Sequence, residues 1–149
     1  MAVEWQLVVD CADPVALSLF WAQAMEYEPE DNTVLIDRLL AEGLVKEEDL
    51  REVDGRKVFA TVVAIRHPDD PVDGSTGIGL GRRVLFQVVP ESKTVKNRLH
   101  VDLKVGAARR ADTVRRLEGL GATFVRAVDE PGASHVTMRD PEGNEFDVQ

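Results

Sequence analysis

The sequence carries one pattern twice: an alternating apolar segment, an amphipathic helical segment and then further β-rich segments. The first copy begins at residues 4–10 and continues into a helix opened by Asp13 and Pro14. The second begins at residues 98–105, about 95 residues later, and continues into a helix that ends at Gly121. The repeat predicts two modules of one architecture, and 149 residues are enough to bury a substantial core.

In the first copy, the alternation places Trp5, Leu7 and Val9 on one face of a strand, which predicts that this face is buried. Asp13 is the predicted N-cap of the following helix, and Pro14 suits its first position. The helix carries an apolar stripe at helical spacing, formed by Leu17, Phe20, Trp21 and Ala24.

Further along the first copy, a second helix is predicted for residues 33–41, where Val34, Leu35, Arg38 and Leu39 are in register and Gly43 stops the helix. Strands are predicted for 57–65 and 83–89, with a Gly- and Pro-rich loop between them. The run 77–81 has the sequence Gly-Ile-Gly-Leu-Gly, but it leads into a strand rather than a helix. We therefore interpret it as a hairpin or pocket lid, not as a phosphate-binding loop.

In the second copy, Leu99, Val101 and Leu103 alternate with polar residues, which predicts another half-buried strand over 98–105. A helix follows, and then three strands are predicted at 122–128, 134–139 and 145–149. The turn 140–144, Asp-Pro-Glu-Gly-Asn, joins the last two strands.

The charge is unevenly distributed along the chain. The formal net charge is −9, which argues against a nucleic-acid partner. Residues 26–54 hold eleven acidic and three basic residues, whereas residues 82–116 hold ten basic and three acidic ones. The basic stretch therefore favours an anionic or carboxylate-bearing ligand.

Two further features bear on location. The only cysteine is Cys11, so no intrachain disulfide is expected. The sequence has neither an apolar run long enough for a membrane span nor a signal-peptide pattern, so we expect a cytoplasmic protein with no membrane partner.

Three motifs stand in the order typical of one superfamily. Residues 10–14 (Asp-Cys-Ala-Asp-Pro) precede Leu-Phe-Trp at 19–21, residues 85–103 carry Lys-Asn-Arg-Leu-His, and residues 140–146 read Asp-Pro-Glu-Gly-Asn-Glu-Phe. Together they resemble the glyoxalase-like proteins of the vicinal oxygen chelate (glyoxalase/bleomycin resistance/dioxygenase) superfamily. The resemblance implies an α+β fold in which two βαβββ modules form a half-open barrel around a central cavity.

On this basis residues 1–149 are expected to form a single glyoxalase-like domain. Module one spans about 1–91 with a helical, acidic insertion at about 28–55, and module two spans about 98–149. Both modules are present in one chain, so a complete cavity does not require a partner. Homodimers are common in proteins of this superfamily, and a homodimer is an alternative to the monomer.

The resemblance also implies a ligand set for one divalent metal ion. Carried over by position, the metal ligands are Gln6, Gln87, His100 and Asp147, and the ion is Mn²⁺, Ni²⁺, Zn²⁺ or Fe²⁺. The period-two alternation independently places His100, Asp102 and Asp147 on one face, opposite Phe146. Because amide oxygens are weak neutral ligands, the same residues equally fit a hydrogen-bonded network lining an apolar pocket.

His100 and Asp147 are the candidate catalytic residues. Asp102 lies two residues after His100 on the same face, where it can orient the imidazole. The remaining residues predicted to line the ligand pocket are Gln6, Gln87, His135 and Arg98.

Two functions are compatible with these residues. One is a glyoxalase-like enzyme that performs metal-assisted lyase or isomerase chemistry on a small oxygenated or carboxylate-bearing substrate. The other is a non-catalytic protein on the same fold that binds a small molecule such as an antibiotic. Fold alone does not choose between them.

Overall fold

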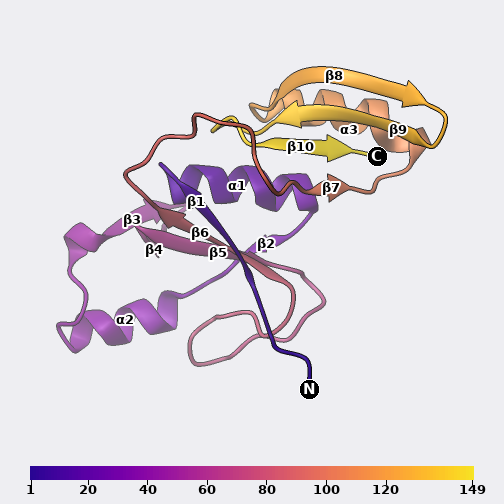
Figure 1. Cartoon of the computed structure of the whole chain (residues 1–149). Helices are drawn as coiled ribbons and strands as arrows, with labels where there is room; N and C mark the ends of the chain where they lie inside the picture. Colours follow the sequence, from indigo (N-terminus) through magenta and orange to yellow (C-terminus); the bar gives the residue numbers. More distant parts are fainter. The chain divides into compact units, whose positions relative to one another are not determined.

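The computed structural model describes residues 1–149, which divide into two compact units, Met1–Glu91 and Ser92–Gln149. Each unit combines a four-stranded sheet with a helix, so the predicted α+β class is confirmed (Figure 1). None of the helices has the length and apolar character that crossing a membrane requires.

The first unit contains a sheet with the strand order β1-β6-β5-β2. Its strands are β1 (Leu7–Cys11), β2 (Glu28–Pro29), β5 (Val62–Arg66) and β6 (Arg83–Val88). β1 and β6 are parallel, and the other neighbours are antiparallel. Helix α1 (Pro14–Met25) packs against β5 and β6. Asp13 caps this helix as predicted, because its carboxylate accepts a hydrogen bond from the Ala16 amide at 3.1 Å.

The segment between β2 and β5, which covers most of the predicted insertion, adds further elements to this unit. It contains α2 (Thr33–Ala41), the 3₁₀ turn η1 (Glu47–Asp49) and a hairpin of β3 (Leu50–Val53) and β4 (Arg56–Phe59). The bounds of α2 match the prediction, but the predicted apolar register is wrong, since Ile36 is its one buried residue. The strand predicted for 57–65 is in fact two strands, β4 and β5, which belong to different sheets.

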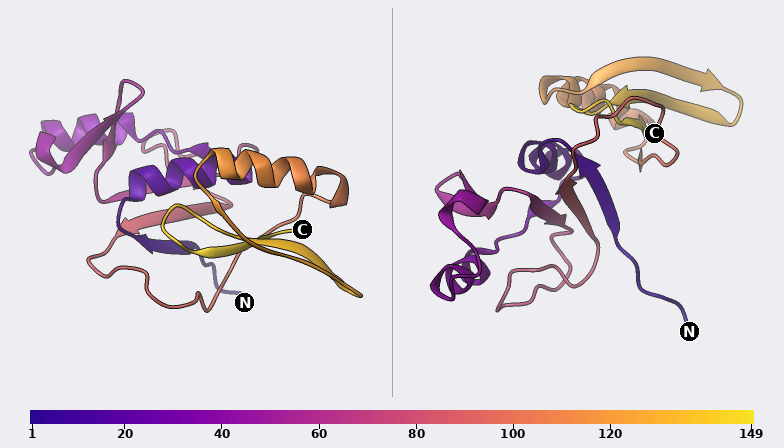
Figure 2. Two further views of the ribbon diagram at one scale, coloured as in Figure 1. Left: turned by 90° about the horizontal axis from the view of Figure 1, so that it is seen from above. Right: turned by 60° about the vertical axis from the view of Figure 1, so that its left-hand side comes forward.

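The second unit repeats the topology of the first. Its sheet has the order β7-β10-β9-β8, formed by β7 (Asp102–Leu103), β8 (Thr123–Glu130), β9 (Ala133–Arg139) and β10 (Glu145–Val148). β7 and β10 are parallel, and the remaining pairs are antiparallel. Helix α3 (Ala107–Gly119) packs against β8 and β10, on one face of this sheet (Figure 2). The predicted internal repeat is therefore present as two βαβββ modules.

The apolar stripes that cover the sheets were largely predictable. All four residues of the α1 stripe are buried, as are Phe86 on β6 and Phe146 on β10. Burying each large apolar side chain stabilises the fold by about 1.5–3 kcal/mol. Two core predictions are wrong, because Trp5 and Leu99 are 85% and 80% exposed. Both precede the points where β1 and β7 begin to pair, so neither lies on a sheet face.

The glycine-rich run is closely packed within the first unit. Gly77 has a φ of +75°, and a Cβ built there would lie 1.8 Å from the backbone oxygen of Asp31. The amide of Gly79 donates to the buried carboxylate of Glu30 at 2.8 Å, and Glu30 also pairs with Arg83. An antiparallel bridge between Val72 and Gly79 gives the loop the form of a hairpin, as predicted, and its role as a pocket lid stays a prediction.

Candidate functional site

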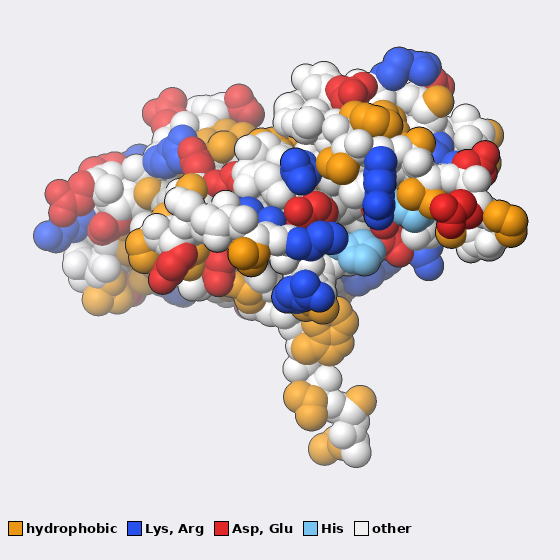
Figure 3. Space-filling view, turned by 45° about the horizontal axis from the view of Figure 1, so that its top comes forward, with side chains coloured by type: hydrophobic (Ala, Val, Ile, Leu, Met, Phe, Trp, Pro, Cys, Tyr) orange, Lys and Arg blue, Asp and Glu red, His pale blue; other side chains and the backbone are white.

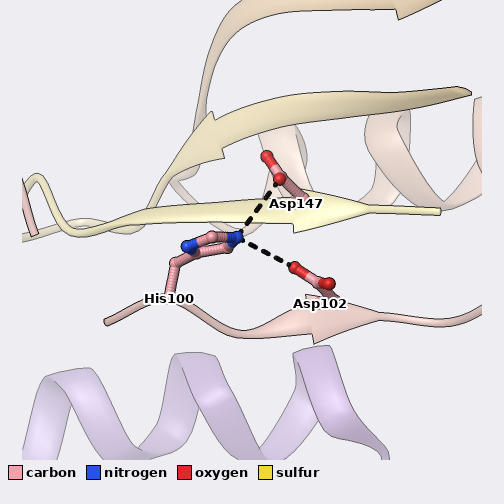
Figure 4. A group of neighbouring side chains, drawn as sticks. All are labelled: His100, Asp102 and Asp147. Carbon is pink, nitrogen blue, oxygen red and sulfur yellow. Dashed lines mark ion pairs between the residues drawn. The ribbon is translucent and has the colours of Figure 1, made fainter. Parts of the chain in front are cut away.

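The candidate site is a cluster of polar side chains on the second sheet. Parallel pairing places Asp102 of β7 directly opposite Asp147 of β10, and His100 lies just before β7. The imidazole Nε2 of His100 lies 3.2 Å from Oδ1 of Asp102 and 3.5 Å from Oδ2 of Asp147. The ring therefore lies between the two carboxylates (Figure 4). The alternation predicted these three residues on one face; the structure brings them together, with His100 just outside β7.

The cluster is accessible from solvent. The side chain of His100 is 47% exposed, that of Asp102 is 35% exposed and that of Asp147 is 15% exposed. Histidine side chains are visible at the molecular surface, beside acidic and basic groups (Figure 3). A small ion or molecule can thus reach the carboxylates without a change in the fold.

Each carboxylate also receives a hydrogen bond from a neutral group. The hydroxyl of Thr137 donates to Oδ1 of Asp147 at 2.7 Å, and the side-chain amide of Gln149 donates to Oδ2 of Asp102 at 2.9 Å. His135 on β9 brings its Nε2 to 3.7 Å from Oδ2 of Asp147. Thr137 was not predicted, and the signal that identifies it is its register opposite Asp147.

The segment before His100 is tied to β10. The amide of Asn97 and the ammonium of Lys93 both donate to Oε2 of Glu145. The Asn97 amide in particular lowers the pKa of Glu145 to about 2. Arg98 is exposed one residue further along, so this anchored segment presents its charge to solvent beside His100.

Gln6 and Gln87 belong to the first unit, where both are exposed. The amide oxygen of Gln6, its metal-ligating atom, accepts a hydrogen bond from Nη1 of Arg83 at 2.7 Å. Gln87 lies on β6, in register with Asp10 of β1. Their participation in a metal site together with His100 stays a prediction.

The first unit has a cavity of its own, between α1 and the β3–β4 hairpin. Its volume is about 60 Å³, which holds a few water molecules but is far below the roughly 300 Å³ of a small ligand pocket. Its lining includes none of the predicted site residues.

The donor set of the cluster suits a divalent metal ion. One nitrogen of His100 and one oxygen each of Asp102 and Asp147 all lie within 4.8 Å of one another. Ligands bound at about 2.1 Å to one ion are separated by roughly 3–4 Å, so small side-chain shifts bring all three into coordination. Imidazole with two carboxylates also supplies the negative charge that the predicted amide-rich set lacks.

Solved structures with this fold come from several bacteria. FosX, a fosfomycin resistance protein from Mesorhizobium loti, has a TM-score of 0.60 at 10% identity and covers 100% of this chain and 91% of its own. FosX from Listeria monocytogenes, solved as a mutant with Mn(II) and 1S,2S-dihydroxypropylphosphonic acid, has a TM-score of 0.60 at 9% identity, with coverages of 100% and 90%. A glyoxalase/bleomycin resistance protein/dioxygenase family enzyme from Burkholderia phytofirmans has a TM-score of 0.57 at 15% identity, with coverages of 96% and 94%.

No curated protein sequence matches this chain significantly. The sequence model of the glyoxalase-like domain, in contrast, matches residues 6–149. That match spans both βαβββ modules and the whole polar cluster. The chain therefore belongs to the glyoxalase-like domain family, within the vicinal oxygen chelate superfamily.

Proposed function

We propose that this protein is a glyoxalase-like enzyme that binds one divalent metal ion through His100, Asp102 and Asp147. Its proposed substrate is a small oxygenated or carboxylate-bearing molecule, and its reaction is of the lyase or isomerase type. The observation that carries the proposal is the convergence of the three donor atoms within 4.8 Å. Mn²⁺, Ni²⁺, Zn²⁺ and Fe²⁺ all accept imidazole and carboxylate ligands.

When bound, such an ion supplies Lewis-acid polarisation of a substrate oxygen. The residues of the chain have distinct parts in this proposal. His100, just before β7, and Asp147 of β10 hold the site from two neighbouring segments, and Asp102 of β7 adds the second negative charge. His135 offers a further group for taking up or releasing a proton, at Nε2, 3.7 Å from the Asp147 carboxylate.

The proposed substrate class follows from the charge next to the site. Lys96 and Arg98 are exposed on the segment that the Asn97–Glu145 hydrogen bond anchors beside His100. Unpaired basic side chains at this position attract an anionic ligand. The Listeria FosX complex, which contains Mn(II) and a phosphonic acid, is a precedent for a metal ion and an anionic compound on this fold.

One observation favours the alternative of a non-catalytic binding protein. Thr137 and Gln149 already donate hydrogen bonds to the two carboxylates without an ion, and Nε2 of His100 lies 3.2 Å from Asp102. A network satisfied in this way can equally line a ligand pocket. Gln6 and Gln87 remain candidate residues of the site under either function, and a homodimer remains a predicted assembly.

Calorimetric titration of the purified protein with Mn²⁺, Ni²⁺ and Zn²⁺ tests the metal site. We expect one equivalent of ion to bind to the wild type and His100→Ala to weaken binding at least about 10-fold. Leu99→Ala is the matched control, because its side chain is exposed and adjacent, and it should leave the affinity unchanged. Unchanged ion affinity in His100→Ala would remove His100 from the site.

Turnover separates the enzyme from the binding protein. The ion-loaded protein is mixed with a panel of small carboxylates, phosphonates and α-hydroxycarbonyl compounds and followed by NMR. New product signals that disappear in Asp147→Asn support the enzyme. Ligand broadening without any product supports the binding protein instead.

A further inference from the structure

Each of the two carboxylates of the site has one oxygen that accepts a hydrogen bond from a neutral donor and one open oxygen, which faces an imidazole. Oδ1 of Asp147 accepts the Thr137 hydroxyl at 2.7 Å, and Oδ2 faces the Nε2 atoms of His100 and His135 at 3.5 and 3.7 Å. Oδ2 of Asp102 accepts the Gln149 amide at 2.9 Å, whereas Oδ1 faces His100 at 3.2 Å. The open oxygens of both carboxylates are therefore the ones directed at the same imidazole nitrogen.

The two donors are themselves held by the sheet. Thr137 lies opposite Asp147 in the antiparallel register of β9 and β10, so its hydroxyl reaches the carboxylate from a paired strand. The backbone amide of Gln149 donates to the Leu103 carbonyl at 2.9 Å, and its carbonyl accepts from the Val105 amide at 2.9 Å. Backbone pairing thus fixes both side chains next to the carboxylates that they contact.

The chemical nature of the donors matters as much as their position. A Lys or Arg in either place would add a positive charge and compete with a cation for the carboxylate. A hydroxyl and an amide are neutral, so they restrict the rotation of each carboxylate and leave its negative charge intact. Neutral donors around metal-ligating carboxylates commonly set the ligand orientation and the affinity for the ion.

We infer that Thr137 and Gln149 are positioning residues that make Asp147 and Asp102 each present a single, preset oxygen to the metal ion. The inference rests on the proposed metal site. It explains why each aspartate should bind through one oxygen, which leaves the other coordination positions of the ion free for substrate oxygens. Neither residue touches the ion or the substrate in this role.

The test is the Mn²⁺ dissociation constant, measured by calorimetry for the wild type and four variants. Thr137→Val and Gln149→Leu remove one donor each with little change in volume, and we expect each to weaken Mn²⁺ binding by about 10–100-fold. Thr137→Ser keeps the hydroxyl and should restore the affinity to within about 3-fold of the wild type. Thr123→Val is the control, since Thr123 lies on β8, away from Asp147 in the register.

Melting temperatures in excess EDTA distinguish positioning from general loss of structure. The inference predicts that Thr137→Val and Gln149→Leu lose affinity while their metal-free melting temperatures stay close to that of the Thr123→Val control. Tight Mn²⁺ binding by the wild type with unchanged affinity in both variants overturns the positioning role alone. A wild type that binds none of Mn²⁺, Ni²⁺ or Zn²⁺ overturns the proposed metal site itself, and the positioning role falls with it.

Discussion

Replacing Asp102 by Asn distinguishes a metal site from a purely structural ion-pair network. In the absence of metal, the substitution removes the repulsion between Asp102 and Asp147, whose facing oxygens lie within 4.8 Å. At that distance in water the repulsion is about 1 kcal/mol. The substitution also weakens the contact between residue 102 and His100, and an ion pair this exposed contributes at most about 1 kcal/mol. The two effects oppose each other, so the free energy of unfolding of the metal-free variant should lie within about 1 kcal/mol of that of the wild type.

With metal present, the two proteins should differ. An ion at 100 times its dissociation constant stabilises the wild type by about 2.7 kcal/mol. If the loss of one carboxylate weakens binding 100-fold, the order expected when a charged ligand is removed, the same ion concentration stabilises the variant by only about 0.4 kcal/mol. The predicted gap of roughly 2 kcal/mol therefore arises only when the ion is added.

The assay is urea unfolding followed by circular dichroism, in EDTA and in Mn²⁺. Asp129→Asn is the control, because Asp129 is an exposed aspartate on β8 and its substitution changes the net charge equally. It should retain the full stabilisation by Mn²⁺. Equal stabilisation of Asp102→Asn and the wild type would refute the assignment of Asp102 as a ligand. A metal-free loss of several kcal/mol would instead identify a structural ion pair.

Two further predictions concern the framework around the site. Gly77→Ala should lower the free energy of unfolding in urea by more than about 2 kcal/mol, because Gly77 has a φ of +75° and the new Cβ would clash with the Asp31 backbone. Gly74→Ala is the control, since a Cβ there meets nothing within 4 Å, and it should change the stability by less than about 0.5 kcal/mol. Equal effects of the two substitutions would contradict the close packing of this run. Glu145→Gln should cost about 1–3 kcal/mol at pH 7, since Glu145 holds the Asn97 amide as a carboxylate. The folded-state pKa of Glu145 is lowered from 4.5 to about 2, so the stability difference between the wild type and Glu145→Gln should be complete above about pH 4.5 and should be lost as the pH falls towards 2. A stability difference that does not change with pH in that window would show that the charge of Glu145 is not what anchors the segment.

Much of the fold could be predicted because the deciding signals are local. The Asp13–Pro14 start of α1, its apolar stripe and the Asp-Pro-Glu-Gly-Asn turn each depend on a few neighbouring residues. The β3–β4 hairpin, which takes residues 56–59 away from the strand predicted for 57–65, also had a local signal: the Asp54–Gly55 pair, whose positive φ angles form its turn. The strand propensity of residues 57–65 outweighed that signal in the prediction.

The errors concern features that depend on distant partners. The alternation predicted strands that begin at or before Trp5 and Leu99. A strand extends only as far as a neighbouring strand offers hydrogen bonds, however, and β7 pairs with β10 over only two residues. The buried face of α2 depends on what packs against it, which the sequence of the helix alone does not specify.

The candidate site shows the same division. The period-two pattern placed His100, Asp102 and Asp147 on one face, because alternation is a property of each strand by itself. The pairing of Asp102 with Asp147 and of Thr137 with Asp147 depends on the register between strands. Asp102 was therefore predicted to orient His100 and to line the ligand pocket but not to bind the metal ion, and Thr137 was missed.

Anomalous diffraction from crystals grown with Mn²⁺ would locate the metal ion directly. We expect one manganese peak within about 2.0–2.3 Å of Nε2 of His100 and of a single oxygen each of Asp102 and Asp147. An amide oxygen of Gln6 or Gln87 at the same distance would add that residue to the ligand set. No manganese peak at this cluster, or a peak bound only by other residues, would contradict a metal site formed by His100, Asp102 and Asp147.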